Sequence, residues 1–269
     1  LAVLHDVTKL KHLENMRTEF IANVSHELRT PITAVKGFAE TLLDGAMNDE
    51  VICKNFLQII QNESDRLHRL ILDLLDLSKI ELNTEVLKVK QIDLKELIQS
   101  TIQSLDPQIE KHHLKLYQEL NSVHADVDED RIRQVIINLV TNAITYTPES
   151  GKIMVKLRKS GDNKVFIEVE DTGIGIPKNK LNTIFNRFTQ IDGSLKKQHD
   201  GSGLGLAISK DLAALLGGTI SAKSMLNQGS VFEISVLLKI AENQSKFDIS
   251  ETFNNINLSH FRLPNPSIV

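Results

Sequence analysis

The sequence predicts a protein of two parts: an α-helical hairpin that pairs into a dimeric four-helix bundle, followed by an α+β domain. Three observations predict this fold. Apolar residues recur at helical spacing through two long stretches near the N-terminus, a short polar link separates these stretches, and helical and strand-like segments are mixed after Leu87. The content of 41% hydrophobic and 25% charged residues is typical of a globular chain.

The first part is expected to contain two long helices, over about residues 9–46 and 50–82. The second helix carries a heptad seam with one polar slot at Glu63, and its apolar members are Cys53, Phe56, Ile60, Leu67, Leu70, Leu74 and Leu77. The polar link 44–49 folds the helices back on each other. A lone hairpin buries little apolar surface, so we expect a second copy to complete a bundle. A monomer whose hairpin packs on the rest of the chain is the alternative.

The second part combines helices with an antiparallel or mixed sheet. We expect helices at 94–109, 128–146 and 204–216, and strands at 114–119, 152–158, 164–171, 218–224 and 230–237. The predicted domain bounds are a linker over 1–12, the hairpin over 13–84 and the α+β domain over 88–239. Residues 240–269 show no apolar period and are expected to form a disordered tail.

Composition excludes several classes of protein. With 31 basic and 35 acidic residues the net charge is −4, so we expect no nucleic-acid partner. Cys53 is the only cysteine, which excludes an intrachain disulfide or a thiolate metal cluster, and we expect it to be a small buried residue. No run approaches the roughly 20 apolar residues that cross a bilayer. The chain begins with Leu1, so we expect an upstream portion of the protein to be missing.

His26 is the first candidate for chemistry. On a helical wheel its direction lies roughly 160° from the centre of the apolar face, so it points to solvent. That face consists of Phe20, Val24, Leu28, Val35 and Leu42. Glu27 can accept a proton from the imidazole, and Thr30 lies one turn later on the same face. An ordinary surface histidine is the alternative. The sequence favours a zinc-protease motif even less, because threonine stands where the second histidine ligand would be required.

Two glycine-rich loops are candidates for a nucleotide site. Asp171 ends a strand just before Gly173 and Gly175, and an aspartate there can accept a hydrogen bond from an exocyclic amine. The second loop, 201–205, opens a helix whose N–H groups can face a phosphate. Asn138 and Asn142 share one helical face and could present amide oxygens to a cation. Ordinary turns and a polar surface are the alternatives. A dinucleotide fingerprint and a Walker loop are both excluded by residues at required positions.

The segment Ser25-His26-Glu27-Leu28-Arg29-Thr30-Pro31 resembles the H box of sensor histidine kinases. The resemblance implies that His26 is the phosphoacceptor and Glu27 the general base. It also implies that Glu27 and Thr30 support dephosphorylation of the partner protein. The H box most resembles that of phosphate-regulon and cell-wall sensor kinases.

Five segments in order resemble the ATP-binding domain of these kinases: 138–142, 171–175, 185–188, 201–205 and 229–232. That domain belongs to the superfamily shared with DNA gyrase, Hsp90 and MutL, so the resemblance implies an α+β sandwich of the Bergerat (GHKL) type that binds ATP and Mg²⁺. Asn142 would ligate Mg²⁺ with support from Asn138, Tyr146 would pack by the adenine, and Asp171 would bind its amine. The remaining ATP-site residues implied are Gly173, Gly175, Arg187, Gly201, Gly203, Leu204 and Gly205, with 191–200 as a lid.

One position departs from the family pattern. Thr145 stands where a Lys or Arg usually contacts phosphate, and loss of that cation should weaken binding or slow transfer. Arg187, Lys196 or Lys197 could compensate.

The resemblance implies a homodimeric enzyme that phosphorylates His26 from ATP, passes the phosphoryl group to an aspartate of a response regulator and can dephosphorylate that regulator. Residues 1–12 resemble the end of a PAS sensor domain and its linker, which implies the cytoplasmic portion of a bacterial sensor anchored in the membrane through an upstream segment. Two alternatives remain: an ATPase of the gyrase or Hsp90 kind, and a catalytically silent scaffold, which Thr145 motivates.

Overall fold

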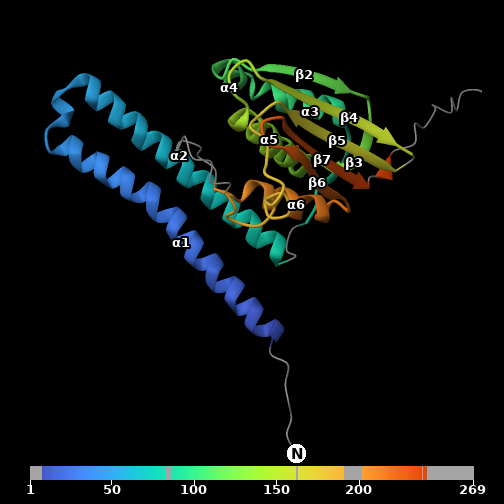
Figure 1. The fold of residues 1–269 in the computed structure, drawn as a ribbon, viewed down its shortest axis with the longest axis horizontal. Coiled ribbons are helices and arrows are strands. Elements are labelled where there is room, and N and C mark those ends of the chain that lie inside the picture. Colours follow the sequence, from blue (N-terminus) through green and yellow to red (C-terminus); the bar gives the residue numbers. More distant parts are fainter. Residues whose placement is uncertain (1–7, 83–85, 162, 191–201, 238, 241–269) are drawn as a thin grey trace, which may run out of the picture.

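The first two long helices confirm the predicted hairpin. The structure is a computed structural model that describes residues 8–82, 86–161, 163–190, 202–237 and 239–240. Helix α1 (Thr8–Leu43) runs without a break through Pro31, and α2 (Glu50–Glu81) returns beside it after the short 3-10 helix η1 (Ala46–Asn48) (Figure 1). Asp49 caps α2, because its carboxylate accepts hydrogen bonds from the backbone N–H groups of Val51 and Ile52 at 3.0 Å each.

The apolar seam of the hairpin is only partly buried within one chain. Phe38 of α1 packs against Phe56 of α2, with ring centroids 5.0 Å apart. Leu70 and Leu77 of α2 are buried and belong to the same hydrophobic core as the second domain. Cys53 is half-buried, not buried as expected. It lies in the first turn of α2, and that end of α2 is remote from the second domain (Figure 1).

The second domain is an α+β sandwich, as predicted. Its elements in chain order are β1 (Val89–Asp93), α3 (Leu94–Gln103), α4 (Asp106–Lys111), β2 (Lys115–Leu120), β3 (His124–Asp128), α5 (Glu129–Tyr146), β4 (Lys152–Ser160), β5 (Lys164–Asp171), α6 (Gly205–Leu215), β6 (Thr219–Met225), β7 (Gly229–Leu237) and β8 (Lys239–Ile240). The main sheet has the order β2-β4-β5-β7-β6, in which only the β2–β4 pair is parallel. A small antiparallel sheet has the order β1-β3-β8.

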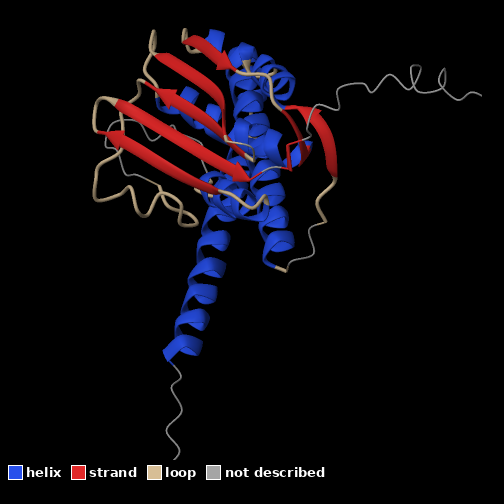
Figure 2. Ribbon diagram, turned by 90° about the vertical axis from the view of Figure 1, so that its right-hand side faces the viewer, coloured by secondary structure: helices blue, strands red, loops and turns tan. Residues whose placement is uncertain are grey.

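Helices cover one face of the main sheet and leave the other open (Figure 2). Along β4 and β5 every second residue is buried, as a sheet with one covered face requires. On the open face Lys156 bonds to Glu168 and Glu170, each at 2.9 Å. The facing helix α5 buries Ile132, Val135, Ile136, Leu139, Val140, Ala143 and Ile144, which recur at helical spacing. Because this face of α5 packs on the sheet, it determines which other residues of α5 can face the candidate site.

Two features of this domain differ from the sequence expectation. The helix predicted over 94–109 is two helices, α3 and α4, because Pro107 lies in the first turn of α4 and cannot donate a backbone hydrogen bond to a preceding turn. The short strands β1, β3 and β8 were not predicted. β1 shows no alternation of buried and exposed residues, so its sequence carries no strand period.

The second domain rests against the C-terminal half of α2, where two acidic side chains share a helical face. Asp73 Oδ2 accepts a hydrogen bond from Ser202 Oγ at 3.1 Å. Asp76 Oδ2 accepts one from Gln134 Nε2 at 2.8 Å and lies 3.5 Å from the Arg131 guanidinium. Burial raises the pKa of Asp73, and the hydrogen bond from Ser202 opposes that rise. These contacts join α2 to α5 and to the loop that opens α6.

Candidate active site

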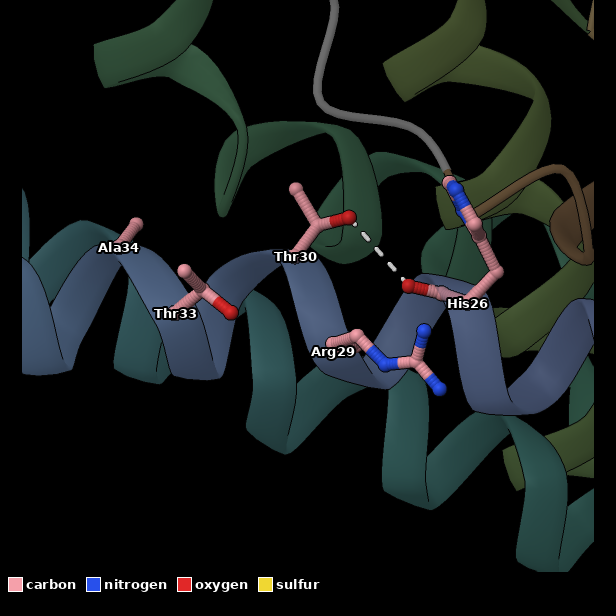
Figure 3. Close-up of a pocket in the computed structure, with 5 residues that line it drawn as sticks. All are labelled: His26, Arg29, Thr30, Thr33 and Ala34. Atoms are coloured by element: carbon pink, nitrogen blue, oxygen red, sulfur yellow. Dashed lines mark hydrogen bonds between the residues drawn. The ribbon is translucent and has the colours of Figure 1, made fainter.

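His26 lies exposed on α1, on the rim of an open pocket. Arg29, Thr30, Thr33 and Ala34 line the pocket with it, and its volume is about 450 Å³ (Figure 3). The Thr30 hydroxyl donates to the backbone carbonyl of His26 at 3.3 Å. The imidazole is therefore open to an incoming group, as the helical wheel predicted, and the Thr30 hydroxyl one turn later faces the His26 backbone.

Glu27 lies between the two helices of the hairpin. Its carboxylate is 3.6 Å from the Arg66 guanidinium of α2, and that guanidinium also lies 3.9 Å from Glu63. Glu27 and Arg66 are each about a quarter exposed, at 24% and 23% of their side chains. The carboxylate next to His26 is thus held by a charged partner and remains in contact with solvent.

Asp171 and the loop after it form the first half of the candidate nucleotide site. The Asp171 side chain is buried, and its Oδ1 accepts a hydrogen bond from the Gly173 N–H at 2.7 Å. Burial raises the pKa of Asp171, while the N–H groups of Gly173 and Ser230 act in the opposite direction. Gly175 has a φ of +66°, and a Cβ there would lie 2.0 Å from the Met225 carbonyl oxygen. Only glycine fits that turn.

Helix α5 connects this loop to the start of α6. Asn138 Nδ2 donates to the Gly205 carbonyl at 3.2 Å and to Ser209 Oγ at 3.4 Å. At the other end of α5 the Tyr146 carbonyl accepts from the Ile174 N–H at 3.1 Å, and burial raises the pKa of the Tyr146 phenol. Residues predicted from three separate motifs are therefore in contact.

The donor set is compatible with Mg²⁺ bound together with phosphate oxygens. Within the described ranges there is no cluster of three or more His, Cys, Asp or Glu side chains that could hold a metal ion. Asn138 uses its amide nitrogen for contacts to α6, which leaves its carbonyl oxygen for a cation. Asn142 lies one turn later and is half-buried. Mg²⁺ accepts such amide oxygens when a nucleotide supplies the remaining ligands.

The loop that opens α6 is the second half of the site. Gly203 has a φ of +69°, and its carbonyl accepts a hydrogen bond from the Phe188 N–H at 2.9 Å. Leu204 is buried at the start of α6, and its N–H donates to Ser202 Oγ at 3.2 Å. Gly201 and the expected lid 191–200, with Lys196 and Lys197, lie outside the described residues.

Arg187 lies at the contact between the two parts of the chain. It is bonded to Glu81 of α2, its guanidinium is 3.7 Å from Asp211 of α6, and it lies 5.8 Å from the Phe20 ring centroid. Two carboxylates engage Arg187, so its predicted contact with phosphate requires release from them and stays a prediction.

Thr145, the position that departs from the family pattern, makes a contact within α5. Its hydroxyl donates to the Thr141 carbonyl at 2.8 Å.

Ser224 and Ser230 contact the Asp171 loop, and sequence reasoning gave neither a role. Ser230 lies in the segment 229–232, which carries part of the family resemblance. Ser224 is the last residue of the strand predicted over 218–224, and no local pattern distinguishes it from its polar neighbours. Its importance depends on contacts across the sheet.

Comparison with known proteins identifies both parts. Residues 16–83 match the His Kinase A (phospho-acceptor) domain, and residues 127–240 match the histidine kinase-, DNA gyrase B- and HSP90-like ATPase family. The chain belongs to the sensor histidine kinases. The match to a phospho-acceptor domain covers His26, and the ATPase match covers both glycine loops.

Curated relatives include the sensor kinase WalK of two bacteria. The Staphylococcus epidermidis protein is 35% identical over 244 residues, which cover 90% of this chain and 40% of the relative. The Bacillus subtilis protein is 34% identical over 242 residues, covering 89% and 39%. The chain thus spans about two fifths of the length of these relatives. Among the helices in the described ranges, none has the length and apolar character to span a membrane.

Solved structures of histidine kinases share the fold. AdeS of Acinetobacter baumannii superposes with a TM-score of 0.66 at 29% identity, covering 79% of this chain and 98% of that one. ThkA, crystallised with the response regulator TrrA, gives 0.68 at 29% identity, covering 86% and 65%. Full-length ShkA in complex with AMPPNP gives 0.62 at 26% identity, covering 83% and 46%.

Proposed function

We propose that this chain transfers the γ-phosphoryl group of Mg-ATP to a ring nitrogen of His26 and then to an aspartate of a response regulator. One observation carries the proposal. Phe188, whose N–H bonds to Gly203 of the α6 loop, packs against Phe20 of α1 with ring centroids 5.7 Å apart. Phe20 precedes His26 by six residues, which is about 9 Å along a helix. The loop proposed to bind phosphate therefore adjoins the helix that carries the acceptor.

The proposed chemistry uses the residues already described. A bond forms between the γ-phosphorus and the imidazole nitrogen of His26, and the bond from that phosphorus to the bridging oxygen of ADP breaks. Glu27 accepts the proton of the other ring nitrogen, and Arg66 holds the Glu27 carboxylate in place. Mg²⁺ held by Asn142, with Asn138 in support, would neutralise charge on the phosphates.

A second copy of the chain is the proposed partner of the hairpin. Large apolar side chains stay exposed along both helices in the single chain, and they include Ile32, Leu43, Val51, Leu57, Ile71, Leu72 and Leu75. A four-helix bundle of two hairpins would bury such residues. The response regulator would dock on the open face around His26, where Thr30 supports dephosphorylation.

The domain bounds 13–84 and 88–239 and the phosphate-regulon subtype remain predictions. The predicted linker 1–12 lies largely, and the tail 240–269 almost entirely, outside the described residues. We further propose that the chain is the cytoplasmic part of a bacterial sensor anchored in the membrane. The curated WalK relatives are sensor kinases that extend well beyond the matched region, which supports this proposal.

The test is incubation with γ-labelled Mg-ATP, followed by measurement of label on the protein. We expect label that is stable in base and lost in acid, and none on His26→Ala. His68→Ala is the matched control, because His68 is also exposed but lies on α2. Label that persists on His26→Ala contradicts the assignment. ATP hydrolysis without label favours the ATPase alternative, and failure to bind ATP while a regulator still binds favours the scaffold that Thr145 motivates.

A further inference from the structure

Ser224, near the end of β6, is at the centre of a hydrogen-bond network behind the Asp171 loop. Its hydroxyl donates to the Gly229 carbonyl at 2.7 Å, accepts from the Ile176 N–H at 2.7 Å and lies 3.0 Å from Ser230 Oγ. A serine hydroxyl has one proton and two acceptor sites. Because the proton goes to Gly229, the Ser230 hydroxyl is the donor in the third contact. All three capacities of Ser224 are therefore used.

Each of these contacts leads to one end of the Asp171 loop. The Ser230 N–H bonds to the Asp171 carboxylate, and Asp171 pairs with Ser230 in the β5–β7 register. Gly229 is packed so closely that a Cβ there would lie 1.9 Å from the Asp171 carbonyl oxygen. The Ile176 N–H is the anchor at the far end of the loop. Ser224 thus connects the start and the end of the segment that carries Asp171, Gly173 and Gly175.

We propose that Ser224 is a positioning residue for base recognition: it holds the Asp171 carboxylate and the following loop in the one arrangement that meets the adenine amine. The proposal rests on the proposed function, in which Asp171 binds that amine. Ser224 acts through Ser230 and Ile176 and does not itself contact the nucleotide. Ile176 and Ser230 are 8% and 6% exposed, so water has little access to replace a lost partner.

The prediction concerns base selectivity more than affinity. A general loss of stability weakens ATP and inosine triphosphate alike, because the two share ribose and phosphates. Inosine triphosphate carries an oxygen where ATP carries the amine, so its contact with Asp171 places two acceptors together. A displaced Asp171 loses the favourable contact with ATP and also the repulsion of inosine triphosphate.

The experiment measures the dissociation constants of ATP and inosine triphosphate for four forms of the whole chain. We define selectivity as the dissociation constant of inosine triphosphate divided by that of ATP. We expect Ser224→Ala to lower this ratio by about tenfold, the usual cost of a lost buried hydrogen bond. Ser224→Thr keeps the hydroxyl and should keep the wild-type ratio. Ser221→Ala is the matched control, since Ser221 lies exposed on the same strand.

An unchanged ratio for a folded Ser224→Ala protein overturns the positioning role. If thermal unfolding shows that Ser224→Ala is not folded, Ser224→Cys replaces it, since a thiol has nearly the same size and hydrogen-bonds weakly. That variant should give an intermediate ratio, and a wild-type ratio overturns the proposal. A wild-type chain that binds ATP without selectivity overturns the assignment of Asp171 as the base-reading residue, and one that binds no ATP overturns the proposed function itself.

Discussion

Replacement of Asp171 by asparagine tests the candidate base-binding residue directly. Asparagine keeps an Oδ1 that can accept from the Gly173 N–H, now at 2.7 Å, so the loop geometry should survive. The other side-chain atom changes from an acceptor to an NH₂ donor. In the proposed complex this donor would face the donor amine of adenine, and the mismatch would leave buried polar groups unpaired. We expect a cost of about 1–3 kcal/mol, which weakens ATP binding roughly five- to 150-fold.

The same substitution should make the stability of the variant, relative to the wild type, increase as pH rises towards neutral. Burial raises the pKa of Asp171, so the folded state binds this proton more tightly than the unfolded state. The free energy of unfolding contributed by this group therefore falls as pH rises from the ordinary pKa to the raised one. Asp171→Asn has no such titration. The unfolding free energy of the variant minus that of the wild type should grow across that pH window and stay constant above it.

Isothermal titration with ATP and inosine triphosphate, together with thermal unfolding between acidic and neutral pH, measures both effects. In the variant the affinity for inosine triphosphate should rise relative to that for ATP, because the exocyclic carbonyl oxygen of its base can accept from the new NH₂ group. Asp126→Asn, an exposed carboxylate on the small sheet, is the control. Unchanged ATP affinity, or a difference in unfolding free energy between variant and wild type that does not grow from acidic to neutral pH, would refute the reasoning about this carboxylate.

Two further predictions concern the loop and the contact between domains. Gly175→Ala should lower both the melting temperature and ATP affinity, because its Cβ would lie 2.0 Å from the Met225 oxygen. Gly161→Ala is its control, with a similar φ of +64° and open space around the Cβ, and equal losses in both variants would show that backbone strain alone is responsible. Asp76→Ala removes the acceptor that lies 2.8 Å from Gln134. Backbone hydrogen exchange at the start of α5 should therefore become faster. Unchanged exchange would mean that this contact does not hold the domains together.

Much of the fold could be predicted because its signals are local. The hairpin follows from apolar spacing and a polar link, and the strands β4, β5, β6 and β7 follow from alternation and turn residues. β1, β3 and β8 could not be predicted in this way. The five-residue β1 has no alternating face, and β3 lies in the small sheet that β1 and β8 complete. Pairing between such segments depends on the neighbours that the rest of the fold supplies.

The candidate site shows the same division. The sequence alone determined that His26 is exposed on a helix beside Glu27, and it placed Asp171 at the end of a strand, because helical and strand periods set the direction of each side chain. Tertiary structure decided which distant residues meet. Asn138 reaches Gly205, and Ser224 holds Ile176, over separations of 67 and 48 residues. Such contacts arise only when packed helices and paired strands bring remote segments of backbone together. Local sequence patterns therefore cannot predict them.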